Sequence, residues 1–156
     1  MTFEPIRPEH DTALAALIRR SLEARGLDIP GTAYYDEGLD HLSEYYALPG
    51  RAYYVLLEDG KLIGGIGFAA FGGFPACCEM QKLYLADEYQ GRKTGYRMIA
   101  FLEQKAAEAG YRRVYLETHS NLQAAIHIYE RSGYQRIDPP PSVVHSTMDR
   151  FYLKDL

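Results

Sequence analysis

The strongest constraint on the fold is a β-hairpin in residues 51–71, which read RAYYVLLEDGKLIGGIGFAAF. Two runs typical of strands flank Asp59-Gly60, a pair that favours the tight type I′ turn between antiparallel strands. Three of the four residues from 64 to 67 are glycine, which predicts a bulge or close packing against a neighbour. No helical pattern opens after these glycines, so they do not form a dinucleotide-binding fingerprint.

Helical and strand patterns alternate around this hairpin. Before it, residues 2–6 are typical of a short edge strand. Asp11 is then placed to cap a helix, because apolar residues recur at helical spacing from Leu14 to Leu22. Residues 39–48 also have a helical pattern, which ends at a Pro-Gly pair.

The segment after the hairpin predicts, in chain order, a strand in residues 76–88, a long helix ending at Gly110, a buried strand in residues 112–118, a helix in residues 119–134, and strands near 135–137 and 150–154. Ser120 or Asn121 is placed to cap the second of these helices, and Gly133 to end it. The order predicts a single α/β (α+β) domain over residues 1–156, with a mixed sheet and helices on its faces.

Composition argues against several classes of function. The formal net charge is −4, whereas a general nucleic-acid binder needs a basic surface. No apolar run is long enough to cross a membrane, and the N-terminus does not resemble a secretory signal. Cys77 and Cys78 are adjacent, which disfavours a disulfide, and no zinc-type cluster accompanies them. We therefore expect a cytoplasmic protein with no nucleic-acid, membrane or metal partner.

Residues 88–98, EYQGRKTGYRM, join an expected strand to the longest expected helix. The first N–H groups of a helix lack partners within it, and the helix dipole adds partial positive charge there. Arg92, Lys93 and Thr94 supply cations and a hydroxyl, so the loop could hold a pyrophosphate, although it does not match the P-loop. A solvated turn with a few basic residues fits these local features equally well.

From Glu79 to Ile137 the chain resembles the GNAT superfamily of acyl-CoA N-acyltransferases. Three features carry the resemblance: a strand leading into a Q/R-x-x-G-x-G/A loop and helix at residues 90–95, a turn into VYLET at 114–118, and Asn121 placed eight residues before Tyr129, with Gly-Tyr following. Lys93 departs from the family pattern, which prefers glycine at that position. A lysine has a narrower choice of backbone angles than glycine, which puts pyrophosphate affinity rather than the fold in question.

The resemblance implies a mostly antiparallel central sheet with two splayed parallel strands and flanking helices. Acetyl-CoA, as co-substrate and without a metal, would lie between those two strands. The residues implied to bind it are Leu83, Tyr84 and Leu85 along the pantetheine, Gln90, Gly91, Arg92, Lys93, Thr94, Gly95 and Tyr96 around the pyrophosphate, and Asn121 at the pantetheine arm. For Leu83 and Leu85, a place in the sheet core is the simpler alternative.

The resemblance also implies catalytic roles. Tyr129 would be the acid that protonates the departing thiolate, although periodicity alone favours a core tyrosine there. Glu79 would be the base that takes a proton from the amine, and a surface glutamate is the alternative. The rival bases are Glu117 and His119, with His145 and Asp149 as weaker candidates. A main-chain N–H near Leu83 would stabilise the oxyanion.

The implied function is transfer of an acetyl group from acetyl-CoA to a primary amine of a small molecule, by direct attack in a ternary complex. Acidic residues at 36, 37, 40 and 44 could attract a cationic amine, or could form a solvated face. The alternatives are a CoA-binding sensor or interaction module without turnover, and an acetyltransferase acting on a protein amine or on RNA. Homodimers are common in the family, which makes a homodimer one expected state.

Overall fold

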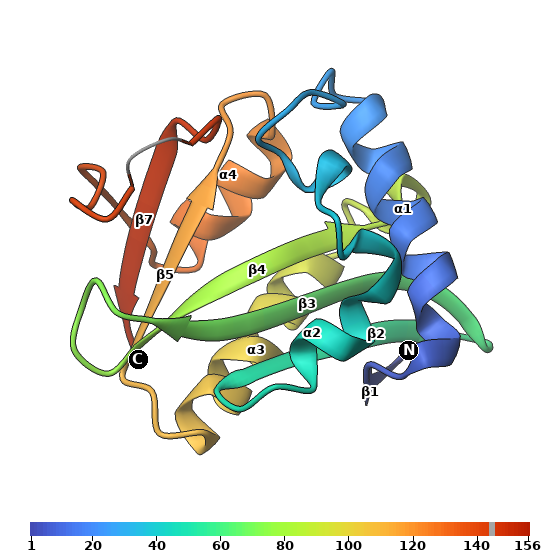
Figure 1. The fold of residues 1–156 in the computed structure, drawn as a ribbon, viewed down its shortest axis with the longest axis horizontal. Helices are drawn as coiled ribbons and strands as arrows, with labels where there is room; N and C mark the ends of the chain where they lie inside the picture. Colours follow the sequence, from blue (N-terminus) through green and yellow to red (C-terminus); the bar gives the residue numbers. More distant parts are fainter. Residues whose placement is uncertain (144–145) are drawn as a thin grey trace.

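The computed structural model describes residues 1–143 and 146–156, and its centre is a seven-stranded sheet (Figure 1). The strands lie in the order β1-β2-β3-β4-β5-β7-β6. Their bounds are β1 Thr2–Pro5, β2 Arg51–Glu58, β3 Lys61–Phe71, β4 Cys77–Leu85, β5 Arg113–Thr118, β6 Gln135–Ile137 and β7 Arg150–Asp155. Neighbouring strands are antiparallel except β4 and β5, which are parallel. This confirms the predicted mixed, mostly antiparallel sheet.

Helices cover both faces of the sheet. In Figure 1, α1 (Asp11–Glu23) and α2 (Leu42–Tyr46) lie in front of it, and α3 (Thr94–Glu108) lies behind. The last helix, α4 (Gln123–Arg131), shares the α3 side of the core. Short 3-10 turns span Pro8–His10, Ala33–Tyr35, Leu39–His41 and Asp87–Tyr89. Within the described residues, no helix is long and apolar enough to cross a membrane.

The β2–β3 hairpin has the predicted turn. Asp59 and Gly60 both have positive φ, 49° and 76°, as a type I′ turn requires. A bulge is also present opposite the glycines of β3: the pairing with β4 shifts between Gly65 and Gly67. The extra residue lies in β4, where Lys82 has the left-handed φ of 51°. The pairing of β3 with β2 also shifts, between Leu56 and Leu57, and there the extra residue is Ile63 of β3. The glycines of β3 thus lie beside irregularities in β3 itself and in the neighbouring β4.

Gly67 of β3 allows the strand to pass directly against β2. A Cβ added there would lie 2.6 Å from the backbone oxygen of Ala52 and 2.4 Å from the Tyr53 ring. Backbone atoms have little room to move, so we expect Gly67→Ala to lower the free energy of unfolding by about 1–3 kcal/mol in urea denaturation. Gly72→Ala is the matched control, because its Cβ would meet open space. Equal stability of the two variants would contradict close packing at Gly67.

The predicted cap of α1 is wrong. Asp11 is the first residue of the helix, and His10 is its N-cap. The Asp11 carboxylate instead accepts hydrogen bonds from Ser43, from the backbone N–H at 2.9 Å and the hydroxyl at 2.6 Å. A tertiary contact to α2 therefore takes the side chain that local spacing assigned to a cap. The helix expected over residues 39–48 divides into the 3-10 turn and the short α2.

The predicted N-terminal cap of α4 is wrong for the same reason. Leu122 is the N-cap residue of this helix. Ser120 donates from its backbone N–H and its hydroxyl to the Asp149 carboxylate, both at 2.8 Å. The Asn121 side chain donates to the carbonyl oxygen of Arg25 at 3.3 Å. Both side chains thus bind distant segments rather than the start of α4. Gly133, with φ 91°, follows the end of the helix as predicted.

Candidate active site

The parallel strands β4 and β5 pair over only a short length. The ladder runs from Cys77 and Arg113 to Glu79 and Tyr115, while the strands continue to Leu85 and Thr118. Beyond this ladder the two strands no longer pair with each other, so their facing edges can bind another extended segment through main-chain N–H and C=O groups. This is the splayed pair that the family resemblance implies.

The bulge at Lys82 lies in the diverging part of β4 and is held from two sides. The Tyr53 hydroxyl donates to the Lys82 carbonyl oxygen at 2.7 Å. The Lys82 ammonium pairs with Asp36 at 2.8 Å. A bulge bends its strand and increases the local twist, and this one lies where β4 has left its pairing with β5.

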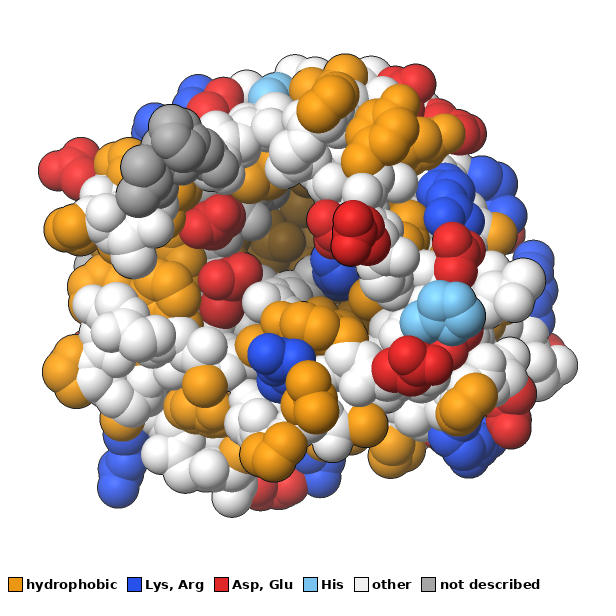
Figure 2. Space-filling model, viewed as in Figure 1, with side chains coloured by type: hydrophobic (Ala, Val, Ile, Leu, Met, Phe, Trp, Pro, Cys, Tyr) orange, Lys and Arg blue, Asp and Glu red, His pale blue; other side chains and the backbone are white. Residues whose placement is uncertain are grey.

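A cavity of about 1120 Å³ opens between the diverging strands. Its walls come from β4, β5, α4, the end of α1, the segment between α1 and α2, α2 itself, and the start of α3 with the loop before it. Figure 2 shows the hollow with acidic side chains on both sides of its mouth. The lining residues that bear chemistry include Glu79, Gln81, Lys82, Glu117, Thr118 and Tyr129.

Most residues predicted to bind the cofactor line this cavity, namely Leu83, Tyr84, Leu85, Gln90, Gly91, Lys93, Gly95 and Tyr96. Three predicted side chains do not line it. The Arg92 guanidinium lies over the Tyr89 ring, 5.6 Å from its centroid. Thr94 is buried at the start of α3, and the exposed Asn121 is bound to the Arg25 carbonyl.

The loop before α3 is fastened to the end of β4. The Gln90 side-chain amide donates to the Leu85 carbonyl oxygen at 3.2 Å and to the Asp87 carboxylate at 2.9 Å. Gly91 and Lys93 then take left-handed conformations, with φ of 76° and 61°. Lys93 is the N-cap of the 15-residue α3, so the unpaired N–H groups of the helix begin beside the cavity. This arrangement can hold an anion.

The left-handed backbone of Lys93 has a steric cost that a glycine there would avoid. We expect Lys93→Gly to raise the free energy of unfolding by about 0.5–1 kcal/mol, after the greater freedom of glycine in the unfolded chain is deducted. Urea denaturation measures this change. Lys93→Ala is the control, because alanine keeps the steric cost while it also removes the ammonium. An equal rise in both variants would contradict strain as the cause.

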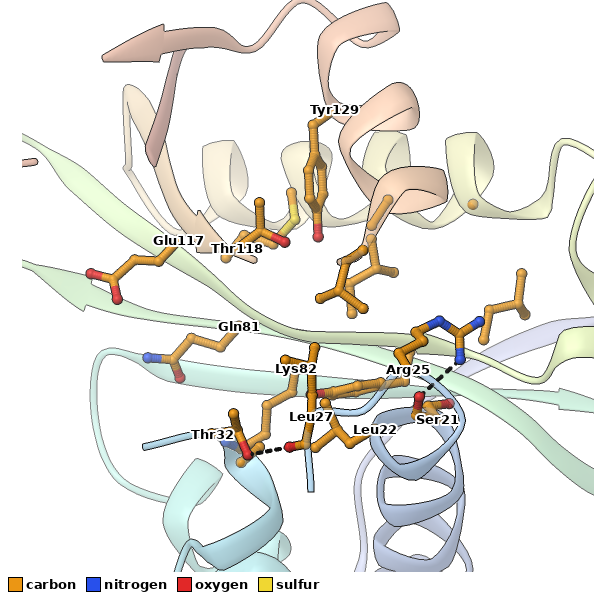
Figure 3. Close-up of a pocket in the computed structure, with 18 of the residues that line it drawn as sticks. Ser21, Leu22, Arg25, Leu27, Thr32, Gln81, Lys82, Glu117, Thr118 and Tyr129 are labelled. Carbon is orange, nitrogen blue, oxygen red and sulfur yellow. Dashed lines mark hydrogen bonds between the residues drawn. The ribbon is translucent and has the colours of Figure 1, made fainter. Parts of the chain in front are cut away.

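Tyr129 projects from α4 into the gap between β4 and β5. Its side chain is 6% exposed, and Figure 3 shows its hydroxyl pointing into the cavity. The ring packs edge-to-face against Tyr134, with 6.1 Å between centroids. Burial raises the pKa of Tyr129, so the phenol stays protonated throughout the neutral range. The side chain is therefore equipped to donate a proton rather than to accept one.

Glu79 is the last residue of β4 that pairs with β5. Burial, and then the charge of Glu117, raise the pKa of Glu79 to about 7. A hydrogen bond from Gln81 and the charge of Lys82 act in the opposite direction. A carboxyl group with this pKa can exchange a proton with a substrate at neutral pH.

Of the rival bases, Glu117 also lines the cavity, and its carboxylate accepts a hydrogen bond from the Tyr115 hydroxyl at 2.8 Å. His119 and Asp149 are not among the lining residues. His119 accepts from the backbone N–H of Asn121 through Nδ1, at 3.0 Å. His145 lies outside the described residues. Of the bases that the sequence predicts, Glu79 and Glu117 are therefore the two that line the described part of the cavity.

The four acidic residues expected near an acceptor divide into two pairs. Asp36 and Glu37 line the cavity, and Asp36 is paired with Lys82. Asp40 is instead held by both guanidinium nitrogens of Arg19, at 2.8 and 2.7 Å, and Glu44 is exposed away from the cavity. Only half of the acidic segment is therefore placed to meet a substrate.

Several lining residues were not predicted from the sequence, and two cases show why. The first, which includes Arg25, Leu27 and Thr32, comes from the end of α1 and the irregular loop after it, where no periodic pattern marks the inward side (Figure 3). The second is Gln81, and strand alternation could have found it. Gln81 is two residues after Glu79, so both side chains lie on the same face of β4.

Solved structures share this architecture. An acetyltransferase of the GNAT family from Staphylococcus aureus Mu50 superposes with a TM-score of 0.85 over 99% of this chain and 98% of its own, at 17% sequence identity. An aminoglycoside 6′-N-acetyltransferase complexed with coenzyme A gives a TM-score of 0.75 over 99% of this chain and 97% of its own, also at 17% identity. At these identities the likeness is one of fold.

Sequence comparison shows a nearer relationship. YjgM of Escherichia coli (strain K12), an uncharacterized N-acetyltransferase, is 34% identical over 132 residues, which cover 83% of this chain and 79% of the relative. The model of the acetyltransferase (GNAT) family matches residues 16–134. That match begins within α1 and includes the loop before α3 and the Tyr129 helix. The chain therefore belongs to the GNAT family of N-acetyltransferases.

Proposed function

We propose that the protein transfers an acetyl group from acetyl-CoA to a primary amine of a small molecule, by direct attack in a ternary complex. One observation carries the proposal: a protonated phenol, Tyr129, and a carboxyl group with a pKa near neutrality, Glu79, line the same cavity. The free start of α3 lies along the same cavity, which supports an anionic cofactor as the acyl donor.

The residues of the cleft fit acetyl-CoA. Main-chain groups of Leu83, Tyr84 and Leu85 would bind the pantetheine as an added strand, because β5 no longer pairs with β4 there. The amides of residues 90–96 would hold the pyrophosphate. This role uses the backbone of Arg92 and Thr94, so it does not require their side chains to face the cavity. Asn121 would reach the pantetheine arm only after releasing its hydrogen bond to Arg25.

The protein side chains then divide the proton transfers. Glu79 takes a proton from the attacking amine, and a main-chain N–H near Leu83 donates to the carbonyl oxygen as it becomes negative. Tyr129 donates a proton to the departing sulfur. Each acid–base step is worth about 10²–10⁴-fold in rate. The chemistry that acetyl-CoA brings is an activated acyl group on a thiolate leaving group.

The acceptor side of the cavity favours a cationic amine. Glu37 and Glu117 line it, while Asp36 is balanced by Lys82. A negative mouth attracts protonated amines and raises their local concentration.

We further infer that the protein acts in the cytoplasm. A homodimer is a second prediction, which light scattering during gel filtration would test.

The test is a panel of amines, incubated with acetyl-CoA and followed by thiol release and mass spectrometry. We expect acetylated product from at least one small cationic amine, together with a rise in thermal stability on adding acetyl-CoA. Acetyl-CoA binding without product from any small amine, polyamine or peptide would contradict the enzymatic proposal and support a sensor. If only peptides are acetylated, the acceptor is a protein amine rather than a small molecule.

A further inference from the structure

The Glu79 carboxyl group is the end of a hydrogen-bonded chain that starts in α2. The Gln81 amide nitrogen donates to Glu79 Oε1 at 3.3 Å, and the Tyr46 hydroxyl donates to Gln81 Oε1 at 2.8 Å. Tyr46 is buried, with its ring packed against Tyr53 at 5.0 Å between centroids. The chain therefore begins at a rigid aromatic side chain.

Tyr46 determines which end of the Gln81 amide faces Glu79. Burial raises the pKa of Tyr46, so its hydroxyl keeps its proton and can donate it to the amide oxygen. With the oxygen engaged, the amide nitrogen is directed at Glu79. A carboxylate only accepts hydrogen bonds, so a donor fixed at this place favours the ionised form of Glu79.

A second fixed group acts on Glu79 from the opposite strand. Glu79 pairs in register with Tyr115, and Glu117 lies two residues further along β5 on the same face. The Tyr115 hydroxyl donates to Glu117 Oε2 at 2.8 Å and so holds this carboxylate in place. Its negative charge favours the protonated form of Glu79.

Resting on the proposed role of Glu79 as the base, we propose that Gln81, oriented by Tyr46, is a positioning residue that holds Glu79 ready to accept a proton, and that Glu117, oriented by Tyr115, opposes it. Gln81 then acts through Glu79 and needs no contact with the reacting atoms. The balance of the two partners decides how readily Glu79 takes up and releases a proton.

The other titratable groups around Glu79 leave this balance intact. Lys82 is the nearby cation, and its charge is shared with Asp36. Burial raises the pKa of Cys77 to about 11 and that of Cys78 to about 12, and it raises the pKa of Tyr46 and Tyr115 as well. All four therefore stay neutral where Glu79 titrates. Within the described residues, Glu117 and Lys82 are the charges acting on Glu79.

The experiment is a ¹³C NMR titration of the side-chain carboxyl groups in protein labelled with ¹³C-glutamate, with the Glu79 signal assigned by its loss in Glu79→Gln. We expect Gln81→Leu to raise the pKa of Glu79, and Glu117→Gln to lower it. Tyr46→Phe keeps the ring and should shift the pKa upward, and less than Gln81→Leu does. If the pKa of Glu79 rises by one unit from about 7, the fraction of Glu79 that is ionised at pH 6.5 falls about eightfold.

Gln104→Leu is the matched control. Gln104 donates to Glu108 at 2.9 Å on the exposed side of α3. The substitution therefore removes the same type of bond far from the cavity, and it should leave the pKa of Glu79 unchanged. Unchanged titration in Gln81→Leu, or shifts of the same sign in Gln81→Leu and Glu117→Gln, would overturn the proposal. Opposite shifts support it. If they occur while the pH profile of turnover stays fixed, the positioning stands and the assignment of Glu79 as base fails.

Discussion

Replacing Tyr129 with phenylalanine is expected to lower kcat by about 10²–10³-fold, because the departing thiolate loses its proton donor. The substitution keeps the ring, so its packing against Tyr134 is preserved. Steady-state kinetics with a saturating amine measures the loss, and isothermal titration measures acetyl-CoA affinity, which should stay within a few-fold of the wild type. An unchanged kcat would remove Tyr129 from the mechanism and leave it as a core tyrosine.

Replacing Glu79 with glutamine is expected to lower kcat/KM by about 10²-fold or more at pH 8 and to change the shape of the pH profile. The pKa of Glu79 is raised to about 7, so the base form predominates above that pH and is lost as the pH falls below it. Wild-type activity should therefore decline as the pH falls through about 7, whereas the variant should lack this decline.

Two controls accompany the Glu79 variant. In Glu117→Gln, activity should still decline as the pH falls, but at a lower pH than in the wild type. If this decline is instead absent from Glu117→Gln and present in Glu79→Gln, Glu117 is the base. The second control is stability. The pKa of Glu79 is higher in the folded state than in the unfolded chain, so stability falls as the pH rises from the ordinary range of a glutamate to about 7, and the loss is complete above that pH. Glu79→Gln should therefore unfold at higher urea concentration than the wild type at pH 8. If Glu79→Gln loses activity while it gains stability, the loss is due to the missing base and not to misfolding.

The parts of the fold set by local chemistry were predictable from the sequence. Asp59-Gly60 determines the hairpin turn through the backbone angles it tolerates, and strand and helix periods gave the order of elements. The splaying of β4 and β5 was not contained in any period. The family resemblance predicted this splaying. In the structure, the diverging part of β4 contains the bulge at Lys82, and no rule for turns identifies that residue from the sequence.

The errors about helix caps share one cause, which is competition between local and tertiary hydrogen bonds. Asp11, Ser120 and Asn121 all sit where a helix cap is expected, yet they bind Ser43, Asp149 and the Arg25 carbonyl, respectively. These partners are distant in sequence. The loop after α1 was equally beyond prediction, because the residues that it contributes to the cavity follow no periodic pattern.

Lys93 shows how a departure from a family pattern can be tolerated. The family prefers a residue without a side chain at this position, and the structure places the lysine in the left-handed region at φ 61°. The lysine takes this conformation at a steric cost of about 1–2 kcal/mol. The proposed anion site uses the amides at the start of α3, which this conformation of Lys93 precedes.

The most direct test of the account is a crystal structure of the protein with coenzyme A bound. The account predicts that the pyrophosphate oxygens accept hydrogen bonds from main-chain N–H groups of residues 91–96. It also predicts that the pantetheine lies between β4 and β5, with its sulfur beside the Tyr129 hydroxyl. Coenzyme A bound on another face of the sheet, or a sulfur remote from Tyr129, would contradict it.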